Sequence, residues 1–302
     1  MPPYLIQFAQ FHEEFRLPEL LSLAKLEKVN IKYSKDDYRL DNPFLKVELD
    51  STTDAEKLVK RAILINTEKN TNLVSIRHIF ELWGSGETYE QVHQQVKSTT
   101  SDRWSSYKQS SFKFVVSAFA STIDKHKQLE IINSFSYLGF EGNIDMKNPQ
   151  VQFHVMADYG GDNGFYNKKP REQPLYIYMG RLVATGSRDL VNTYNLKKRK
   201  YLGTTSMDAE LSLVMANQAL ATPGKVVYDP FVGTGSFLFT CAHFGSFTMG
   251  SDIDGRQIRG KGKAGVHSNI EQYNLQGRVL DALVFDICHN GKLIGKKAKI
   301  EQ

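Results

Sequence analysis

The fold of this protein is decided by residues 227–254, which read VYDPFVGTGSFLFTCAHFGSFTMGSDID. An apolar strand runs into Asp229, and a turn that contains Gly233 and Gly235 follows it. An apolar helix then leads to a second strand, which ends at Asp252. A strand, a glycine turn, a helix and a second strand make up the βαβ unit of a parallel sheet. The pattern therefore predicts an α/β domain whose ligand lies at the carboxyl ends of its strands.

The spacing of these glycines and acids narrows the choice of ligand. Glycine at 233 and 235 permits a positive φ and lets a ligand approach the backbone closely. No third glycine completes the dinucleotide pattern G-x-G-x-x-G, and no Gly-Lys-Ser/Thr follows to hold phosphates. Asp229 can instead hold an ammonium group, and Asp252, 17 residues after Gly235, can accept both hydroxyls of a ribose. A third strand, RVLDALVF, carries Asp281 to a strand tip where it could accept from an adenine amine, so the set favours S-adenosylmethionine over NAD or ATP.

The composition is that of an ordinary globular protein with room for two domains. Its 302 residues are 41% apolar and 24% charged. No apolar run approaches the roughly 18 residues of a membrane span, and the N-terminus lacks the features of a secretory signal. Cys241 and Cys288 give neither a disulfide framework nor a metal cage. We therefore expect no membrane segment, reduced thiols and a cytoplasmic location.

Charge is distributed unevenly along the chain. Residues 1–165 hold 19 Lys/Arg and 22 Asp/Glu, whereas residues 166–302 hold 19 Lys/Arg and 11 Asp/Glu. The basic half fits a polyanionic partner, although an uneven solvating surface is the alternative. The run Lys197-Lys198-Arg199-Lys200 has the same two interpretations, a phosphate grip or a solvated linker.

The first half of the chain alternates between strand-like and helix-like segments, which predicts an α+β module. A helix within 8–29 is expected to bury Leu17, Leu20, Leu21 and Leu23. Residues 73–86 predict a helix or a strand followed by a helix, and Trp83 and Trp104 are expected to pack in a core or hinge. The other expected strands are 44–50, 62–68, 111–121, 151–160 and 175–186, and the other expected helices are 124–142 and 205–221.

Three segments resemble one known family. The stretches YLGTTSMDAELSLVMANQALA, YDPFVGTGSFLFTCAHFG and GSDIDGRQIRG are similar to the catalytic subunit of the eukaryotic tRNA guanine-10 N2-methyltransferases. Upstream, FRLPEL, LGFEGNIDMKNPQVQF and GSRDLVNTYNLKKRKY resemble the RNA-binding part of that family, which includes a THUMP module. The resemblance covers nearly everything from residue 4 to about 290.

The resemblance implies a methyltransferase that uses S-adenosylmethionine and methylates the exocyclic amine of a guanine in tRNA. It also implies a small zinc-binding activator subunit as a partner. Thr204, Thr205 and Asp208 would lie in the segment that closes over the methionine end of the cofactor. The expected cofactor site consists of Asp229, Phe231, Gly233, Gly235, Asp252 and Asp281. The expected RNA-binding residues are Arg188, Lys197, Lys198, Arg199 and Lys200.

Members of this family orient the target amine with an Asp-Pro-Pro-Tyr motif, and this sequence contains none. After Asp286 the sequence departs from the family into a lysine-rich tail. We therefore expect a chain truncated before its acceptor motif, with strand 225–231 left as an apolar sheet edge. A non-catalytic RNA-binding remnant is the alternative function. The expected domains are a THUMP-like RNA-binding region (1–165), a linker (166–203) and an incomplete Rossmann-like methyltransferase domain (204–302).

Overall fold

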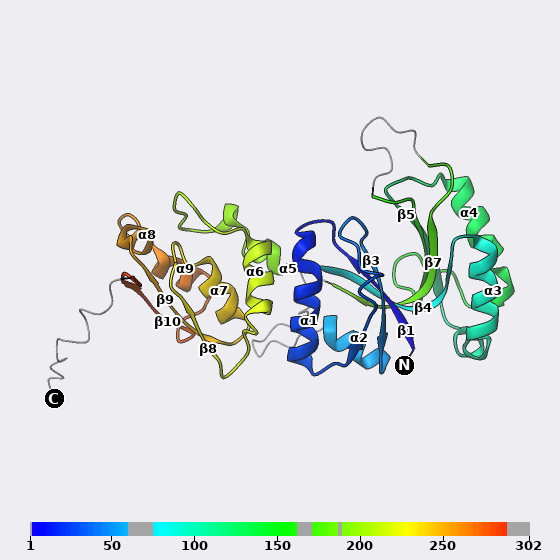
Figure 1. Cartoon of the computed structure of the whole chain (residues 1–302), viewed down its shortest axis with the longest axis horizontal. Helices are drawn as coiled ribbons and strands as arrows, with labels where there is room; N and C mark the ends of the chain where they lie inside the picture. The colour runs from blue at the N-terminus through cyan, green and yellow to red at the C-terminus, as the bar shows by residue number, and fades with distance from the viewer. Residues whose placement is uncertain (1, 60–74, 162–170, 187–188, 289–302) are drawn as a thin grey trace. The chain divides into compact units, whose positions relative to one another are not determined.

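The computed structural model describes residues 2–59, 75–161, 171–186 and 189–288 (Figure 1). These residues form two compact units. Within the described ranges, none of the helices combines the length and the apolar character that crossing a bilayer requires. The first unit contains the described parts of 2–14, 28–59 and 75–186, and the second contains 15–27 and 189–288.

The first unit is built on a mixed sheet with helices on it. Its described strands are β1 (Pro3–Phe8), β2 (Ile31–Lys32), β3 (Phe44–Leu49), β4 (Ile76–Gly86), β5 (Phe112–Phe119), β6 (Val151–Asp158) and β7 (Tyr176–Thr185). They follow the order β2-β3-β1-β4-β7-β6-β5, in which β5 and β6 are parallel and the other neighbours are antiparallel. Its helices are α2 (Thr52–Val59), α3 (Tyr89–Thr100) and α4 (Lys125–Ser134), with 3-10 turns at Ser101–Tyr107 and Ser136–Leu138.

One core cluster of this unit lies between the sheet and helices α3 and α4, which lie on the same side of it (Figure 1), and a second cluster includes Phe80 and Leu82 of β4. Trp83 of β4 is buried there against Val92 and Val96 of α3 and Phe153 of β6. Trp104 packs against the edge of the same cluster. The prediction that both tryptophans serve packing is therefore confirmed.

The prediction of a helix within residues 73–86 is wrong, because the described part forms strand β4. This strand pairs with β1 on one side and with β7 on the other, so it lies inside the sheet. Every residue from Ile79 to Gly84 is buried. A strand covered on both faces shows no polar alternation, and its continuous apolar run reads like a buried helix. The sequence analysis also missed β1, and its expected strand 62–68 lies outside the described residues.

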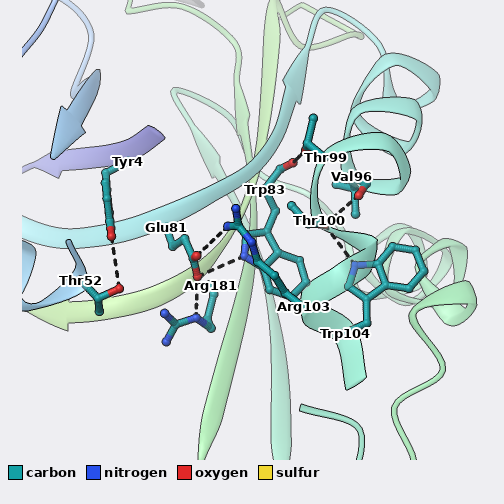
Figure 2. Close-up of polar contacts among 10 residues, drawn as sticks. All are labelled: Tyr4, Thr52, Glu81, Trp83, Val96, Thr99, Thr100, Arg103, Trp104 and Arg181. Atoms are coloured by element: carbon teal, nitrogen blue, oxygen red, sulfur yellow. Dashed lines mark hydrogen bonds and ion pairs between the residues drawn. The ribbon is translucent and has the colours of Figure 1, made fainter. Parts of the chain in front are cut away.

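A buried carboxylate organises polar contacts on the helix-covered face of β4 (Figure 2). Glu81 accepts from Arg103 through Oε1 and from Arg181 through Oε2, each at 2.8 Å. The indole Nε1 of Trp83 also donates to Oε2, at 3.3 Å. The guanidinium of Arg181 lies 5.4 Å from the ring centroid of Tyr107. One acid thus holds two cations and an indole that come from three different elements.

The second unit contains a smaller, wholly parallel sheet. Its described strands are β8 (Val226–Asp229), β9 (Phe247–Asp252) and β10 (Val279–Val284), in the order β10-β9-β8. The predicted strand, glycine turn, helix and strand are confirmed as β8, α7 and β9. The helices are α1 (Arg16–Glu27), α5 (Asp189–Thr193), α6 (Ala209–Gln218), α7 (Ser236–His243), α8 (Gly255–Arg259) and α9 (Val266–Gln272), with a 3-10 turn at Leu196–Lys198. A further 3-10 turn, Glu13–Phe15, lies where the chain passes from the first unit to the second.

Strand β8 forms an edge of this sheet, as the sequence predicts. Among the strands that the structure describes it pairs with β9 alone. Val226 is 67% exposed and Tyr228 is 44% exposed, so part of this edge strand's apolar surface faces solvent. On the opposite edge, Leu280 and Val284 of β10 are also exposed.

Helix α1 belongs to the second unit although the chain on both sides of it belongs to the first. Leu20 and Leu23 are fully buried, as predicted, but Leu21 is 41% exposed. The helix packs on α6, where the amide of Asn217 donates to the carboxylate of Glu19 at 2.7 Å, and both residues are buried. A segment near the N-terminus therefore completes the core of the unit that carries the glycine turn.

Candidate functional site

A cavity of about 710 Å³ opens at the carboxyl edge of the three-stranded sheet, within the second unit. Its walls are the segment 204–207, the turn after β8, the start of α7 and the end of β9. Four of the six predicted cofactor residues line it: Asp229, Phe231, Gly233 and Asp252. Gly235 and Asp281 are not among its lining residues.

The two glycines of the turn are required for different reasons. Gly233 has φ +50°, and the nearest atom to a Cβ added there would be the Phe231 carbonyl oxygen at 4.0 Å, so the added atom would meet open space. Gly235 has φ +87°, and an added Cβ would lie 2.6 Å from Cζ of Phe239. Gly233 therefore leaves room next to the backbone for a ligand. Gly235 is required because the ring of Phe239 on helix α7 packs against it and leaves no space for a Cβ.

We expect Gly235→Ala to destabilise the second unit by about 2 kcal/mol, because it adds a ring clash to backbone strain. The matched control is Gly277→Ala, which has φ +80° and no atom within 4 Å of the added Cβ. Backbone strain alone predicts about 1 kcal/mol for this control. Urea unfolding of both variants in the full chain measures the difference. Equal losses would mean that the Phe239 ring moves aside without penalty.

Asp229 ends β8 at the mouth of the cavity as a half-buried carboxylate. Its Oδ1 accepts from the backbone N–H of Phe231 at 2.9 Å. Burial raises the pKa of the Asp229 carboxyl; the bond from Phe231 opposes this rise, and the nearby charge of Asp252 adds to it. A carboxylate in this position gains by meeting a cation. The site is therefore electrostatically prepared for the positively charged end of a ligand.

Asp252 ends β9 and holds the turn in place. Its Oδ2 accepts from the N–H of Gly233 and its Oδ1 from the N–H of Asp254, each at 2.8 Å. A carboxylate has about four acceptor positions, so these bonds leave lone pairs for a ligand. The parallel register sets Asp229 opposite Gly250, two residues before Asp252. The structure thus brings the two predicted acids to one cavity.

Asp281 does not end its strand, contrary to the expectation from the sequence. It is the third residue of β10, paired with Met249, and the strand continues to Val284 opposite Asp252. The N–H of Phe285 donates to the carbonyl of Asp252 at 3.0 Å, so Asp286 follows directly at the carboxyl edge. The sequence analysis gave this strand as RVLDALVF, which reaches Phe285, but it took Asp281 as the residue at the tip. It did not consider Asp286, the first acid after the strand.

The segment 201–208 forms the wall opposite the glycine turn. The hydroxyls of Ser206 and Thr234 lie 2.9 Å apart, and Ser236 donates to the carbonyl of Met207 at 3.2 Å. A Cβ at Gly203 would lie 2.3 Å from the side-chain oxygen of Gln257, so this wall packs closely. Thr204 and Thr205 line the cavity. Asp208 instead caps helix α6, accepting from the N–H groups of Glu210 and Leu211.

Arg199, predicted as an RNA-binding cation, points into the second unit and is only 7% exposed. Its Nη1 donates to the hydroxyl of Ser236 at 2.6 Å, and its guanidinium lies 5.4 Å from the ring centroid of Phe239. In this position it supports the start of helix α7 and is not offered to a surface phosphate. Lys197, Lys198 and Lys200 are exposed, whereas Arg188 lies outside the described residues.

The sequence matches one family and several curated proteins. The profile of the Tmrp11 THUMP N-terminal domain family matches residues 2–188. The tRNA (guanine(10)-N(2))-methyltransferase of Saccharomyces cerevisiae is 42% identical over 294 residues, covering 96% of this chain and 64% of that protein. The tRNA (guanine(10)-N(2))-methyltransferase TRMT11 of Homo sapiens is 37% identical over 297 residues, covering 94% and 61%. The chain thus spans less than two thirds of the length of these relatives.

Among solved structures, TrmN from Thermus thermophilus aligns over 96% of this chain and 75% of its own length. Its sequence identity is 13% and its TM-score is 0.45. A superposition this loose does not by itself say anything about function.

Proposed function

Because the chain belongs to the Tmrp11 THUMP N-terminal domain family, we propose that it carries the RNA-binding and cofactor-binding parts of a tRNA guanine N2-methyltransferase. The observation that carries this proposal is the cavity between Asp229, Gly233 and Asp252 at the carboxyl edge of a parallel sheet. Ligands of open α/β sheets bind at this edge. The names of the curated relatives that match most of this chain support the substrate.

The residues of the cavity fit S-adenosylmethionine. Its volume of about 710 Å³ lies in the range of small-molecule sites, roughly 300–1,000 Å³. Asp229 would hold the ammonium end, because a cation stabilises its half-buried carboxylate. Asp252 would accept the ribose hydroxyls with its remaining lone pairs, and the open space at Gly233 would admit the ligand close to the backbone. Phe231, 75% exposed at the rim, would offer a ring face to the adenine.

The adenine amine has two candidate acceptors. Asp281 was proposed from the sequence, and its Oδ1 accepts from the N–H of Ala282 at 2.7 Å. Asp286 lies nearer to the carboxyl edge, since Phe285 bonds to Asp252. Comparing Asp281→Asn with Asp286→Asn for cofactor affinity separates the two.

The bound cofactor supplies a methyl group on a sulfonium centre. The chain would hold that methyl group in one place and limit the water around it. Holding the methyl group close to the attacking amine lowers the activation barrier of the transfer. The threonines of segment 201–208 face the turn across the cavity and would close over the methionine end. The guanine has to leave its stack for its amine to reach the cavity.

We propose that the first unit, of the THUMP type, and the lysines before the cavity bind the tRNA. Lys197, Lys198 and Lys200 are exposed and would contact phosphates together with Arg188. The resemblance adds a small zinc-binding activator subunit as a partner and the cytoplasm as the location. The free thiols of Cys241 and Cys288 agree with a reducing compartment.

Two measurements on this chain test the proposal. Calorimetric titration with S-adenosylmethionine should give a saturable heat that Asp252→Ala removes; absence of any heat from the unaltered chain would contradict cofactor binding. Incubation with labelled S-adenosylmethionine and unmodified tRNA then measures methyl transfer to guanine. Cofactor and tRNA binding without transfer would support the alternative, an RNA-binding protein that does not catalyse the reaction.

A further inference from the structure

An open groove of about 960 Å³ lies beside the cofactor cavity in the second unit. One side is the segment 200–204, and the other is helix α8 with the turn that follows it. Its lining residues are Lys200, Tyr201, Leu202, Gly203, Thr204, Asp254, Arg256, Gln257, Gly260, Lys261 and Ala264.

The groove is positively charged. Lys200, Arg256 and Lys261 line it, and Asp254 is the one acid among its lining residues. Arg256 already neutralises that acid through two bonds, Nε to Oδ1 at 2.8 Å and Nη2 to Oδ2 at 3.0 Å. Lys200 and Lys261 are exposed, and neither forms an ion pair within the described residues. Two unpaired cations therefore remain to attract an anion.

A tight turn presents a further lysine at the rim. Lys261 and Ala264 exchange two backbone hydrogen bonds of 3.0 Å, which leaves Gly262 and the exposed Lys263 at the tip. Gly260 has φ +63°, and a Cβ there would lie 1.9 Å from the carbonyl oxygen of Ala264. The turn is thus fixed by its own geometry; Lys261 lines the groove, and the exposed Lys263 lies two residues further along the same turn.

The facing side is also held firmly. The side chain of Asn269 on α9 bonds both the N–H of Tyr201, at 2.9 Å, and its carbonyl, at 3.0 Å. The Tyr201 hydroxyl donates to the carbonyl of Gln257 at 2.8 Å. The N–H of Lys200 donates to the side chain of Gln272 at 2.7 Å. A preorganised wall of this kind binds with a smaller loss of conformational entropy than a loose one.

The groove and the cofactor cavity share a wall. Thr204 and Gln257 line both of them. A chain lying along the groove therefore passes directly beside the place where the cofactor would be held.

We propose that this groove binds the sugar–phosphate backbone of the RNA strand that carries the target base. The inference rests on the proposed function, because it needs an RNA substrate and a cofactor in the neighbouring cavity. An RNA strand carries one negative charge per nucleotide. Cations spaced along an open channel match this charge distribution better than a single enclosed anion site does. Leu202, 44% exposed on the groove wall, offers apolar surface to a ribose or base. The groove would then set the register of the strand at the cavity.

The test is the double variant Lys261→Gln/Lys263→Gln in the full chain. Fluorescence anisotropy measures its binding of unmodified tRNA at several salt concentrations. We expect about a tenfold loss of affinity, and the slope of log affinity against log salt concentration should be smaller in magnitude by about 1 to 2. The control is Lys25→Gln/Lys225→Gln, which removes the same charge from exposed lysines of the same unit. Lys225 precedes β8 at the edge of the sheet opposite the cavity, so this control should keep its affinity within about twofold.

The two proposals fail in different ways. If the Lys261/Lys263 variant binds tRNA as the control does, with the same salt slope, the groove proposal is overturned. If the unaltered chain binds no S-adenosylmethionine while the tRNA result comes out as expected, the proposed cofactor function fails and the groove remains an RNA site. The expected affinity for S-adenosylmethionine is the same in both double variants, which separates lost RNA contacts from a damaged fold.

Discussion

Asp229→Asn is expected to weaken binding of S-adenosylmethionine about 100-fold, or about 2.7 kcal/mol, and to raise the thermal stability of the ligand-free chain at neutral pH. The carboxylate is half-buried at the mouth of the cavity and already accepts from Phe231. Burying an uncharged amide costs less free energy than burying a carboxylate, so the ligand-free variant is more stable. The same amide cannot form an ion pair with the ammonium group of the ligand, so the affinity for the ligand falls. Calorimetric titration and thermal unfolding of the same samples measure both effects.

The pH dependence follows from the direction of the shift at Asp229. Burial raises its pKa in the folded chain, so the proton is held more tightly in the folded state than in the unfolded state. The stability that this proton contributes is present at low pH and is lost as the pH rises through the raised pKa. Affinity for a cationic ligand changes in the opposite direction and falls as the pH drops through the same pKa. The Asp229→Asn variant should show neither dependence on this group.

The control for Asp229 is Glu271→Gln, which removes an exposed acid of the same unit. We expect it to change cofactor affinity less than twofold. Should Asp229→Asn bind S-adenosylmethionine within threefold of the unaltered chain, the ammonium end is held elsewhere. The assignment of the cavity would then need a different orientation of the ligand.

Glu81→Gln is expected to destabilise the first unit by about 3 kcal/mol. The substitution keeps the size of the side chain but removes the charge that holds two guanidiniums (Figure 2). The side chains of Glu81, Arg181 and Arg103 are 11%, 18% and 34% exposed, so solvent compensates only in part. Arg103 and Arg181 would then repel each other beside the buried indole of Trp83. Chemical unfolding followed by tryptophan fluorescence reports on this directly, because Trp83 is a member of the network.

The pair Glu141–Lys108 provides the matched comparison within the same unit. Its carboxylate and ammonium lie 2.8 Å apart, but the two side chains are 55% and 51% exposed. Glu141→Gln should therefore leave the free energy of unfolding almost unchanged. If the free energies of unfolding of the two glutamine variants differ by less than about 1 kcal/mol, burial does not strengthen the Glu81 network. The two arginines would then have other partners.

Much of the candidate cofactor site can be predicted because it is local in sequence. A strand, a turn, a helix and a strand of ordinary length bring Asp229 and Asp252 to adjacent tips of a parallel sheet whatever the rest of the chain does. The glycine turn between them needs no distant contact, and the structure places Gly233, Asp229 and Asp252 around one cavity. These assignments depended on spacing alone, which the sequence displays.

The errors concern residues whose surroundings come from far along the chain. Arg199 looks like one of four surface cations, yet it bonds to Ser236, 37 residues away. Asp281 looks like a strand end, yet its register against Met249 shows that the strand continues. Strand β4 looks helical because its residues are buried on both faces of the sheet. In each case the missing information is which neighbour lies alongside.

The sequence by itself determined which edge of the parallel sheet carries the candidate ligand site and which acids and glycines lie there. The order of these residues along one βαβ unit encodes this without long-range contacts. Only the tertiary structure decided which charges are available to a partner. It turned Arg199 inward, joined Glu81 to two arginines, and placed Lys200 and Lys261 along an open groove. The physical reason is that the availability of a charge depends on burial and pairing, which elements distant in sequence supply when the chain packs.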